Sequence, residues 1–321
     1  MASPSRKILV VGATGQQGSA VLAELAHLAS TSTSPSSSFP KLKILALTRD
    51  ASAKKSVALV PTYGKILDIE VVEGNTTEPG PIFAAHKGID VVFAYTTPPV
   101  DGEENQAKAL ITTAAKSGVK HFVFSSVERG GDVKSWQNPT DVPHFVTKHI
   151  IELHLRKTCT EHPTMTYTIL RPVAFMDNLS PTSGFGPVMA AMWATLPATT
   201  TLQMVSVRDI GVFGAQAVLH PENKRFKNHA IGLAGDELTL LDARAIYRKV
   251  AGLQLPQAWT LVGHAARWMS KDLGRMFNFF DKTGYGVDIR ALRAQEPRLQ
   301  NFETWLRESS TFECGKGTGK K

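Results

Sequence analysis

Two side chains that can carry protons, His144 and Lys148, stand four positions apart in the stretch HFVTK. Four residues is close to one helical turn, so both would lie on one face of a helix. An imidazole has an ordinary pKa of about 6.5, and partial desolvation pushes the pKa of a lysine down, so either group could donate or relay a proton. His144 could equally begin or cap the helix that follows Pro143. The pair predicts acid–base chemistry, with the proton donor left open between the two residues.

Hydroxyl groups also stand at the end of an apolar run, where HFVFSSV contributes Ser125 and Ser126. In a parallel sheet, ligands bind beyond the carboxyl ends of the strands, so either hydroxyl could orient a carbonyl group of a ligand. A local turn hydrogen bond explains the two residues equally well.

Three glycines, Gly12, Gly15 and Gly18, follow the apolar run KILVV at three-residue spacing in GATGQQG. The first permits a tight turn, the second lets the backbone approach a pyrophosphate, and the third allows close contact between helix and strand. This pattern at the junction of a strand and a helix predicts a dinucleotide-binding turn.

The end of the second apolar run decides which dinucleotide is expected. It reads LTRD, so Arg49 is the first polar side chain that can reach the ribose, and Lys54 and Lys55 follow. A cation at this position can pair with a 2′-phosphate, whereas an acidic residue would bind the 2′-hydroxyl. We therefore expect NADP(H), while Asp50 either caps the next helix or competes for the ribose.

The elements that must position these residues alternate along the first half of the chain. Six apolar runs, KILVVGA, KILALTR, IEVVEG, DVVFAYT, HFVFSSV and TYTILRP, are separated by amphipathic stretches such as 17–29 and 103–117. Continuous apolar runs separated by helices indicate an α/β fold with a doubly wound parallel sheet of the Rossmann type. We expect this domain over residues 1–172. A smaller, largely helical substrate or partner domain, rich in Met, Trp and Phe, would follow over 173–321, with some return to the sheet.

Composition sets outer limits on the protein. The 321 residues carry a net charge of +8 and are 42% hydrophobic, which excludes a disordered or membrane-embedded chain. The N-terminus lacks a signal-peptide core and no apolar run reaches roughly 18 residues, so we expect a cytoplasmic protein without a membrane span. Cys159 and Cys314 cannot form a disulfide framework, and the histidines lack metal-ligand spacing. The basic cluster 223–229 lacks the aromatic residues and motifs of a nucleic-acid site, and Ser30 to Ser38 form a predicted flexible insertion.

Taken together, several motifs resemble the NmrA-like family of atypical short-chain dehydrogenases. They are GATGQQG, LTRD, FSSV, LRPVAFMDNLS, VSVRDIG, GDELT and DLGRMFNFFDKTGYGVD, and they cover nearly the whole chain. The resemblance implies a Rossmann domain that holds NADP beside a smaller C-terminal domain. It also implies contacts, by position, from Gly12, Ala13, Thr14, Gly15, Gln16, Gln17, Arg49 and Lys54 to the phosphates and adenosine, from Thr76, Thr77, Thr96 and Thr97 near adenine and ribose, and from Lys148, Phe175, Met176, Asp177 and Asn178 at the nicotinamide end.

The resemblance leaves two functions open. Ordinary short-chain dehydrogenases carry YxxxK, whereas this chain has His144 in place of the tyrosine, an arrangement similar to that of isoflavone-reductase-like enzymes, which depend on the lysine. We expect an NADP-dependent oxidoreductase that transfers hydride to or from a small apolar carbonyl, imine or enone, as in fungal secondary metabolism. The alternative is a catalytically silent NADP(H) sensor that binds a regulatory protein partner, in which case a nuclear location is also expected.

Overall fold

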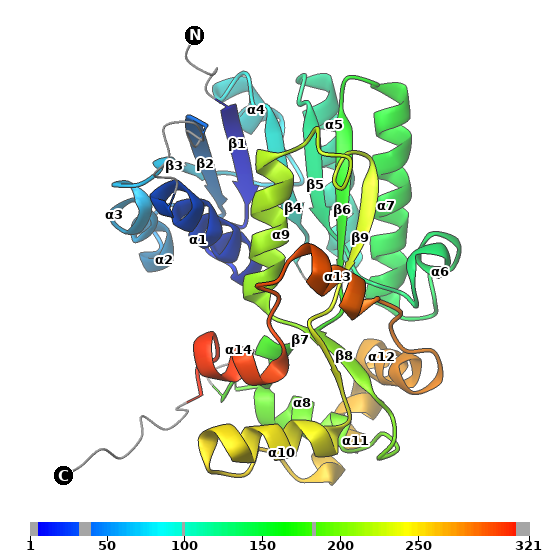
Figure 1. Cartoon of the computed structure of the whole chain (residues 1–321). Coiled ribbons are helices and arrows are strands. Elements are labelled where there is room, and N and C mark those ends of the chain that lie inside the picture. The colour runs from blue at the N-terminus through cyan, green and yellow to red at the C-terminus, as the bar shows by residue number, and fades with distance from the viewer. Residues whose placement is uncertain (1–5, 32–39, 98–99, 182–183, 313–321) are drawn as a thin grey trace, which may run out of the picture. The chain divides into compact units, whose positions relative to one another are not determined.

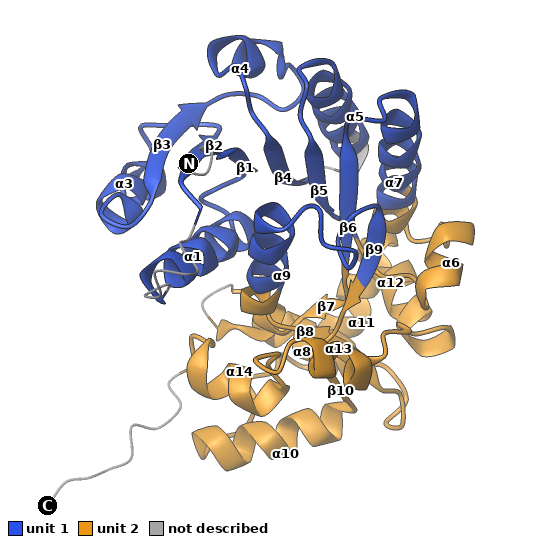
Figure 2. Cartoon of the chain, turned by 45° about the horizontal axis from the view of Figure 1, so that its top comes forward, with its two compact units in different colours: residues 1–126, 147–170, 210–231 blue, residues 127–146, 171–209, 232–321 orange. Residues whose placement is uncertain are grey.

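The computed structural model describes residues 6–31, 40–97, 100–181 and 184–312 (Figure 1). The chain forms two compact units, each built from several segments (Figure 2). Unit 1 comprises 1–126, 147–170 and 210–231, and unit 2 comprises 127–146, 171–209 and 232–321. The sequence suggested a single boundary near residue 172, whereas the chain passes between the units repeatedly.

Among the described residues, seven strands form one sheet in the order β3-β2-β1-β4-β5-β6-β9. Strands β1 to β6 pair in parallel, as predicted for a doubly wound fold. Their order reverses between β1 and β4, which is where such sheets bind ligands beyond the strand ends. The strands are β1 (Arg6–Val11), β2 (Leu42–Thr48), β3 (Asp68–Glu73), β4 (Val91–Tyr95), β5 (His121–Ser125), β6 (Thr166–Pro172) and β9 (His229–Leu233).

Helices cover both faces of this sheet, which explains why its central strands are apolar throughout. Figure 2 shows α1 (Gln16–Thr31) and α9 (Val207–Leu219) on one side, and α5 (Val100–Lys116) and α7 (Pro143–Glu161) on the other. Helices α1 and α9 pack closely at Gly211, where an added Cβ would lie 2.5 Å from the backbone of Ala20. The short helices of unit 1 are α2 (Lys54–Val57), α3 (Leu59–Tyr63) and α4 (Gly80–Ala85).

The predicted insertion after the first helix is shorter than expected at its start. Ser30 and Thr31 still belong to α1, where their hydroxyls donate to backbone carbonyls one turn earlier. The rest of the insertion, residues 32–38, lies outside the described residues, as does Cys314.

Unit 2 is largely helical, as expected, but it also contains a three-stranded sheet that the sequence did not predict. Its order is β10-β8-β7, with strands β7 (Ala174–Phe175), β8 (Leu202–Val205) and β10 (Asp236–Leu238). Met, Trp and Phe residues form one buried cluster that includes Met176, Trp193 and Phe277. The helices are α6 (Asp132–Gln137), η1 (Met176–Leu179), α8 (Gly186–Trp193), α10 (Leu240–Ala251), α11 (Thr260–Met269), α12 (Lys271–Lys282), α13 (Ile289–Gln295) and α14 (Phe302–Glu308).

Within the described ranges, every helix is too short or too polar to cross a membrane.

Candidate functional site

The glycine turn joins β1 to α1 and depends on its glycines for two separate reasons. Gly12 has a φ of +63°, in the left-handed region that side chains disfavour. The amide of Gly15 donates to the carbonyl of Gly12 at 2.8 Å, which closes the turn just before α1 begins at Gln16. A Cβ on Gly18 would lie 2.3 Å from the carbonyl oxygen of Gly12, so this position has no room for a side chain.

A cavity of about 640 Å³ opens at the turn, entirely within unit 1. Its volume falls within the range of roughly 300 to 1,000 Å³ that small-molecule sites occupy. The strand ends that border it are those of β1, β2, β3 and β4. Of the residues that the sequence singled out, the lining includes Gly12, Thr14, Gly15, Arg49, Lys54, Thr76, Thr77 and Thr97, whereas Ala13, Gln16, Gln17, Gly18 and Thr96 lie outside the lining.

The segment after β2 forms one wall of this cavity, and this wall carries cationic side chains. Arg49, Lys54 and Lys55 all line it. Asp50 also borders the cavity, but one of its carboxylate oxygens accepts bonds from the Ser52 amide at 2.8 Å, the Ser52 hydroxyl at 2.6 Å and the Ala53 amide at 3.1 Å. These bonds hold the pKa of Asp50 below its ordinary value. Asp50 therefore stabilises the turn before α2, which leaves Arg49 and the lysines to attract an anion.

Tyr95, the last residue of β4, is a residue that the sequence reasoning missed. Its hydroxyl donates to the carbonyl of Gly12 at 3.0 Å and lies 2.1 Å from where a Cβ on Gly15 would stand. Burial raises the pKa of this phenol, although the positive charge of Arg49 acts to lower it. The only available signal was position, because Tyr95 precedes Thr96 and Thr97 at the strand end.

Lys148 lies in a buried polar cluster of unit 1. Its ammonium forms an ion pair with Glu103 of α5 at 2.8 Å and donates a hydrogen bond to the hydroxyl of Thr96. Thr96 in turn donates to the same Glu103 oxygen at 2.5 Å. Both charged side chains are almost fully buried, at 11% and 5% exposed. Thr96 therefore belongs to the lysine cluster, and the adenine or ribose contact that the resemblance implied for it stays a prediction.

Two opposing effects act on the pKa of Lys148, burial and the nearby carboxylates. Burial lowers the pKa of Lys148 from its ordinary value of about 10.5, while the charges of Glu103 and Glu152 act to raise it. Glu152 lies one turn further along α7 and accepts a hydrogen bond from Ser126 at 2.5 Å. The neighbouring Ser125 hydroxyl is buried and has no hydrogen-bond partner among the described residues. A lysine of this kind can release a proton more readily than one on the surface.

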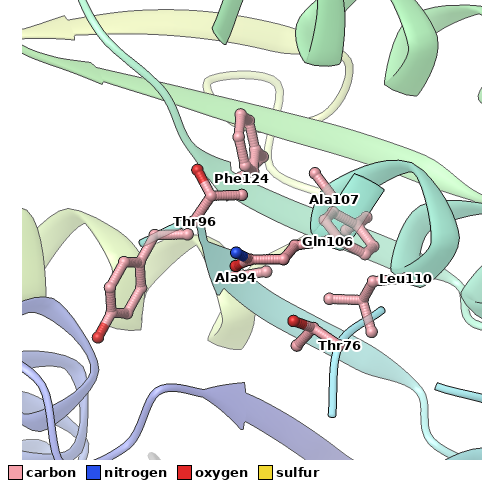
Figure 3. Close-up of a pocket in the computed structure, with 9 residues that line it drawn as sticks. Thr76, Ala94, Thr96, Gln106, Ala107, Leu110 and Phe124 are labelled. Carbon is pink, nitrogen blue, oxygen red and sulfur yellow. The ribbon is translucent and has the colours of Figure 1, made fainter. Parts of the chain in front are cut away.

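A second, very small cavity of about 10 Å³ lies beside the lysine cluster, again within unit 1. Figure 3 shows Gln106 of α5 beside Ala94, with Leu110 and Thr76 nearby around the same space. The Gln106 amide donates to the carbonyl of Thr97 at 3.2 Å. This space holds at most about one water molecule, so α5 packs tightly against β4 here and the space is too small for a ligand.

His144 belongs to unit 2, in the first turn of α7. Its Nδ1 lies 2.7 Å from both carboxylate oxygens of Asp272, and its backbone amide donates to the same carboxylate at 3.1 Å. Burial would raise the pKa of Asp272, but the bonds from His144 hold it below its ordinary value. A carboxylate on one imidazole nitrogen fixes the orientation of the ring, as in catalytic histidine–carboxylate pairs. Asp272 carried no signal in the sequence, because 128 residues separate it from His144.

The predicted nicotinamide segment, Phe175 to Asn178, lies in unit 2 across β7 and η1. Met176 is fully buried in the hydrophobic cluster, together with Met189 and Trp193. Asp177 accepts a bond from the amide of Val207 at 2.8 Å, and burial raises its pKa. The side chains of Met176 and Asp177 are therefore occupied structurally, so a ligand contact from this segment would come from its backbone or from the partly exposed side chains of Phe175 and Asn178.

Comparison with known proteins connects these features to a family. The model of the NmrA-like family matches residues 4–306. The chain belongs to the NmrA-like family. The family resemblance seen in the motifs is thereby confirmed. An NmrA-like family domain-containing protein of Dictyostelium discoideum is 24% identical over 317 residues, covering 95% of this chain and 98% of the relative. An NAD(P)H azoreductase of Xenophilus azovorans is 30% identical over 172 residues, covering 54% of this chain and 49% of the relative.

Solved NmrA-like and reductase structures share the fold. An NADPH-dependent quinone oxidoreductase from Escherichia coli, complexed with NADPH, has a TM-score of 0.66 at 19% identity, with 92% of this chain and 97% of that chain covered. Nmra, a negative transcriptional regulator solved in complex with NAD, has a TM-score of 0.66 at 14% identity, with 97% and 96% covered. At these identities the similarity establishes the Rossmann-type fold alone. One of the two similar structures is an enzyme and the other is a regulator.

Proposed function

We propose that this NmrA-like protein is an NADP(H)-dependent oxidoreductase that transfers hydride to or from a small apolar carbonyl, imine or enone. The observation that carries the proposal is the cavity of about 640 Å³, which combines a glycine turn at one wall with Arg49, Lys54 and Lys55 at another. A glycine turn at the start of a helix binds a pyrophosphate, and a cationic wall after β2 binds a further phosphate.

The proposed preference for NADP(H) over NAD(H) rests on the two charged residues at the end of β2, Arg49 and Asp50. Asp50, the carboxylate that would favour a free 2′-hydroxyl, is committed to Ser52 and Ala53. Arg49 lines the cavity and can form charge-assisted bonds with a 2′-phosphate. The glycine turn fits the nucleotide as well, since Gly12 and Gly15 line the cavity and present backbone without a side chain to it.

The bound nicotinamide would supply or accept the hydride, and the residues of this chain would supply the accompanying proton. Reduction of a carbonyl adds one hydride to carbon and one proton to oxygen. Lys148 suits the donor role because burial lowers its pKa and Glu103 holds its ammonium in place. His144 is the second candidate donor, since Asp272 orients its ring. The names of two similar proteins, an azoreductase and a quinone oxidoreductase, support an unsaturated apolar substrate.

The test begins with cofactor titration by calorimetry. The wild-type chain is expected to bind NADPH more tightly than NADH, and Arg49→Gln is expected to weaken NADPH binding by roughly 10- to 100-fold, because a charge-assisted hydrogen bond contributes about 1.5–3 kcal/mol. NADH binding should change little. Lys43→Gln is the matched control, since Lys43 lies on β2 in an exposed ion pair with Glu70 and outside the cavity lining. Equal affinities for NADPH and NADH in the wild type would refute the NADP preference.

Turnover is then followed through NADPH absorbance with a panel of quinones, azo compounds, enones and imines. Substrate-dependent oxidation of NADPH supports the enzyme. NADPH binding without oxidation across the whole panel would contradict the enzyme while leaving the cofactor site intact.

The second candidate function is a redox sensor in which NADP(H) occupancy controls a protein partner. The observation that favours it is the closed cluster around Lys148, whose charge is already matched by Glu103. The solved regulator Nmra, complexed with NAD, shares the fold. A sensor requires that NADP+ and NADPH shift partner binding differently. Partner capture that is identical with both cofactor forms would reject this function. Under either function we infer a cytoplasmic protein, with the nucleus as a second location for a sensor.

A further inference from the structure

Helix α10 in unit 2 carries two arginines on one face. Leu241, Arg244, Ala245 and Arg248 are spaced three and four positions apart, so their side chains lie along one side of the helix. The opposite side, which includes Ala243, packs into the hydrophobic cluster of unit 2. Like charges four positions apart repel each other, and the positions three and four residues from each arginine hold no acid. The two guanidinium groups therefore form an uncompensated positive centre on this face.

A surface pocket of about 470 Å³ lies at this face. Its volume falls within the range of roughly 300 to 1,000 Å³ that small-molecule sites occupy. The pocket is bordered by α10 and the segment that follows it, entirely within unit 2, and none of its residues lines the cavity at the glycine turn. The lining consists of Leu241, Arg244, Ala245, Arg248, Gln254, Leu255 and Gln257. Two of these residues are cations and none is an acid, which favours an anionic ligand.

The hydrogen-bond donors of this pocket are largely unused. Arg244 donates to the side-chain oxygen of Gln257, which leaves the amide NH₂ of Gln257 without an acceptor in the described part of the chain. The guanidinium of Arg248 makes no hydrogen bond or ion pair with the described residues either. The next residue, Lys249, differs, because it pairs with Glu303 at 2.9 Å. The lining thus offers several donors to a ligand that is rich in acceptors.

The usual role of cations at the end of a helix explains one of the two arginines. Cations in the last turn interact favourably with the helix dipole, and Arg248 and Lys249 both lie there. Arg244 lies one turn earlier, and its bond to Gln257 joins two residues that line the pocket. This bond holds the guanidinium in place before any ligand arrives, which reduces the entropy that binding would cost.

We propose that this pocket, the α10 pocket, binds the phosphate group of a small phosphate monoester. Such a group carries a charge of about −1.5 to −2 at pH 7, which two guanidinium groups balance. Its three terminal oxygens accept bonds from donors on several sides, whereas a single guanidinium fork satisfies a carboxylate. Leu241, which is 70% exposed, and the buried Leu255 supply an apolar wall for the organic part of the ligand.

Calorimetric titration of the full chain with phenyl phosphate tests the proposal. We expect a dissociation constant below about 1 mM, and we expect Arg248→Gln to raise it at least about tenfold, because bonds from a guanidinium to a phosphate are charge-assisted. Lys249→Gln is the matched control, since it removes the same charge from the same helix outside the pocket lining, and it should bind normally. Thermal unfolding verifies that each variant is folded. A wild-type dissociation constant above about 1 mM overturns the proposal.

Phenyl phosphate could also enter the cavity at the glycine turn, so Arg49→Gln separates the two sites. Binding that persists in Arg49→Gln and weakens in Arg248→Gln supports the α10 pocket. The reverse pattern, or an affinity that neither variant changes, would overturn the proposal. The two sites share no lining residue, so the NADP(H) proposal and this one fail independently.

Two further probes test the class of ligand. Benzoate carries a carboxylate on the same ring, and inorganic phosphate lacks the ring. Phenyl phosphate should bind more tightly than either probe, and Leu241→Ala should weaken phenyl phosphate by about two- to fivefold while leaving inorganic phosphate unchanged. Benzoate that binds as tightly as phenyl phosphate would overturn the phosphate assignment. Equal affinities for inorganic phosphate and phenyl phosphate would overturn the monoester assignment.

Discussion

At the scale of single residues, a carboxylate from a distant part of the chain holds each candidate proton donor. Glu103 pairs with Lys148 and Asp272 pairs with His144. The sequence identified the two donors from their spacing on one helix, but neither partner carboxylate could be found in this way. Pairing across 45 and 128 positions depends on the folded topology, which short-range patterns do not encode.

Separating the structural and the chemical roles of Lys148 requires paired variants. Lys148→Met leaves Glu103 buried without its cation and should reduce the free energy of unfolding by about 3–5 kcal/mol. Glu103→Gln/Lys148→Met removes both charges and should regain much of this stability while remaining inactive in hydride transfer. Urea unfolding and NADPH turnover provide the two measurements.

The exposed pair of Lys108 and Glu104 serves as the control for that experiment. Lys108→Met should cost less than about 1 kcal/mol, because surface ion pairs contribute little. Full turnover in the Glu103→Gln/Lys148→Met double variant would show that Lys148 has no part in the chemistry.

His121 gives a prediction for pH. It is fully buried beside the hydroxyls of Thr166 and Thr168, and burial lowers its pKa to about 4 from 6.5. Between these values the unfolded chain binds the proton more readily than the folded chain, so the stability contribution is complete above pH 6.5 and is lost as pH falls toward 4. The loss should approach about 3 kcal/mol. Urea unfolding at pH 7 and pH 5 should show a smaller decline for His121→Gln than for the wild type, and equal declines would contradict the assignment.

At the scale of elements, the apolar runs predicted β1 to β6 closely, because central strands of a parallel sheet are apolar on both faces. The glycine turn was predictable for a similar reason, since its spacing reflects a local backbone geometry. The small sheet of unit 2 was missed because strands such as Ala174–Phe175 are too short to show a periodic pattern. The packing of α9 on α1 could not be predicted either, because it joins residues nearly 200 positions apart in the sequence.

The turn between β1 and α1 should tolerate no side chain at Gly18. Gly18→Ala would place a Cβ against the backbone of Gly12, and we expect a loss of about 1–3 kcal/mol in stability together with at least roughly tenfold weaker NADPH binding. Gly80→Ala is the control, since a Cβ there meets nothing within 4 Å and should be neutral or slightly stabilising. Thermal unfolding and calorimetry measure both effects. Equal behaviour of the two variants would contradict the close packing.

At the scale of the whole molecule, the net charge of +8 favours anionic ligands. Raising salt from about 0.05 to about 0.5 M shortens the range of electrostatic attraction, so NADPH binding should weaken. The weakening should be steeper for NADPH than for NADH, which lacks the 2′-phosphate, and Arg49→Gln should bring the two salt dependences together. Calorimetric titrations across the salt series measure this difference, and parallel slopes for the two cofactors in the wild type would speak against a phosphate contact at Arg49.

The order of strands in the main sheet also has a consequence for synthesis on the ribosome. Strand β9 borders β6 in the sheet but ends at Leu233, about 60 residues after β6 ends at Pro172. At roughly 5–20 residues per second, the edge of β6 stays unpaired for roughly 3–12 seconds after it has been synthesised. The nascent chain therefore carries an open strand edge that can pair with neighbouring chains, and chaperone binding during this interval would protect it.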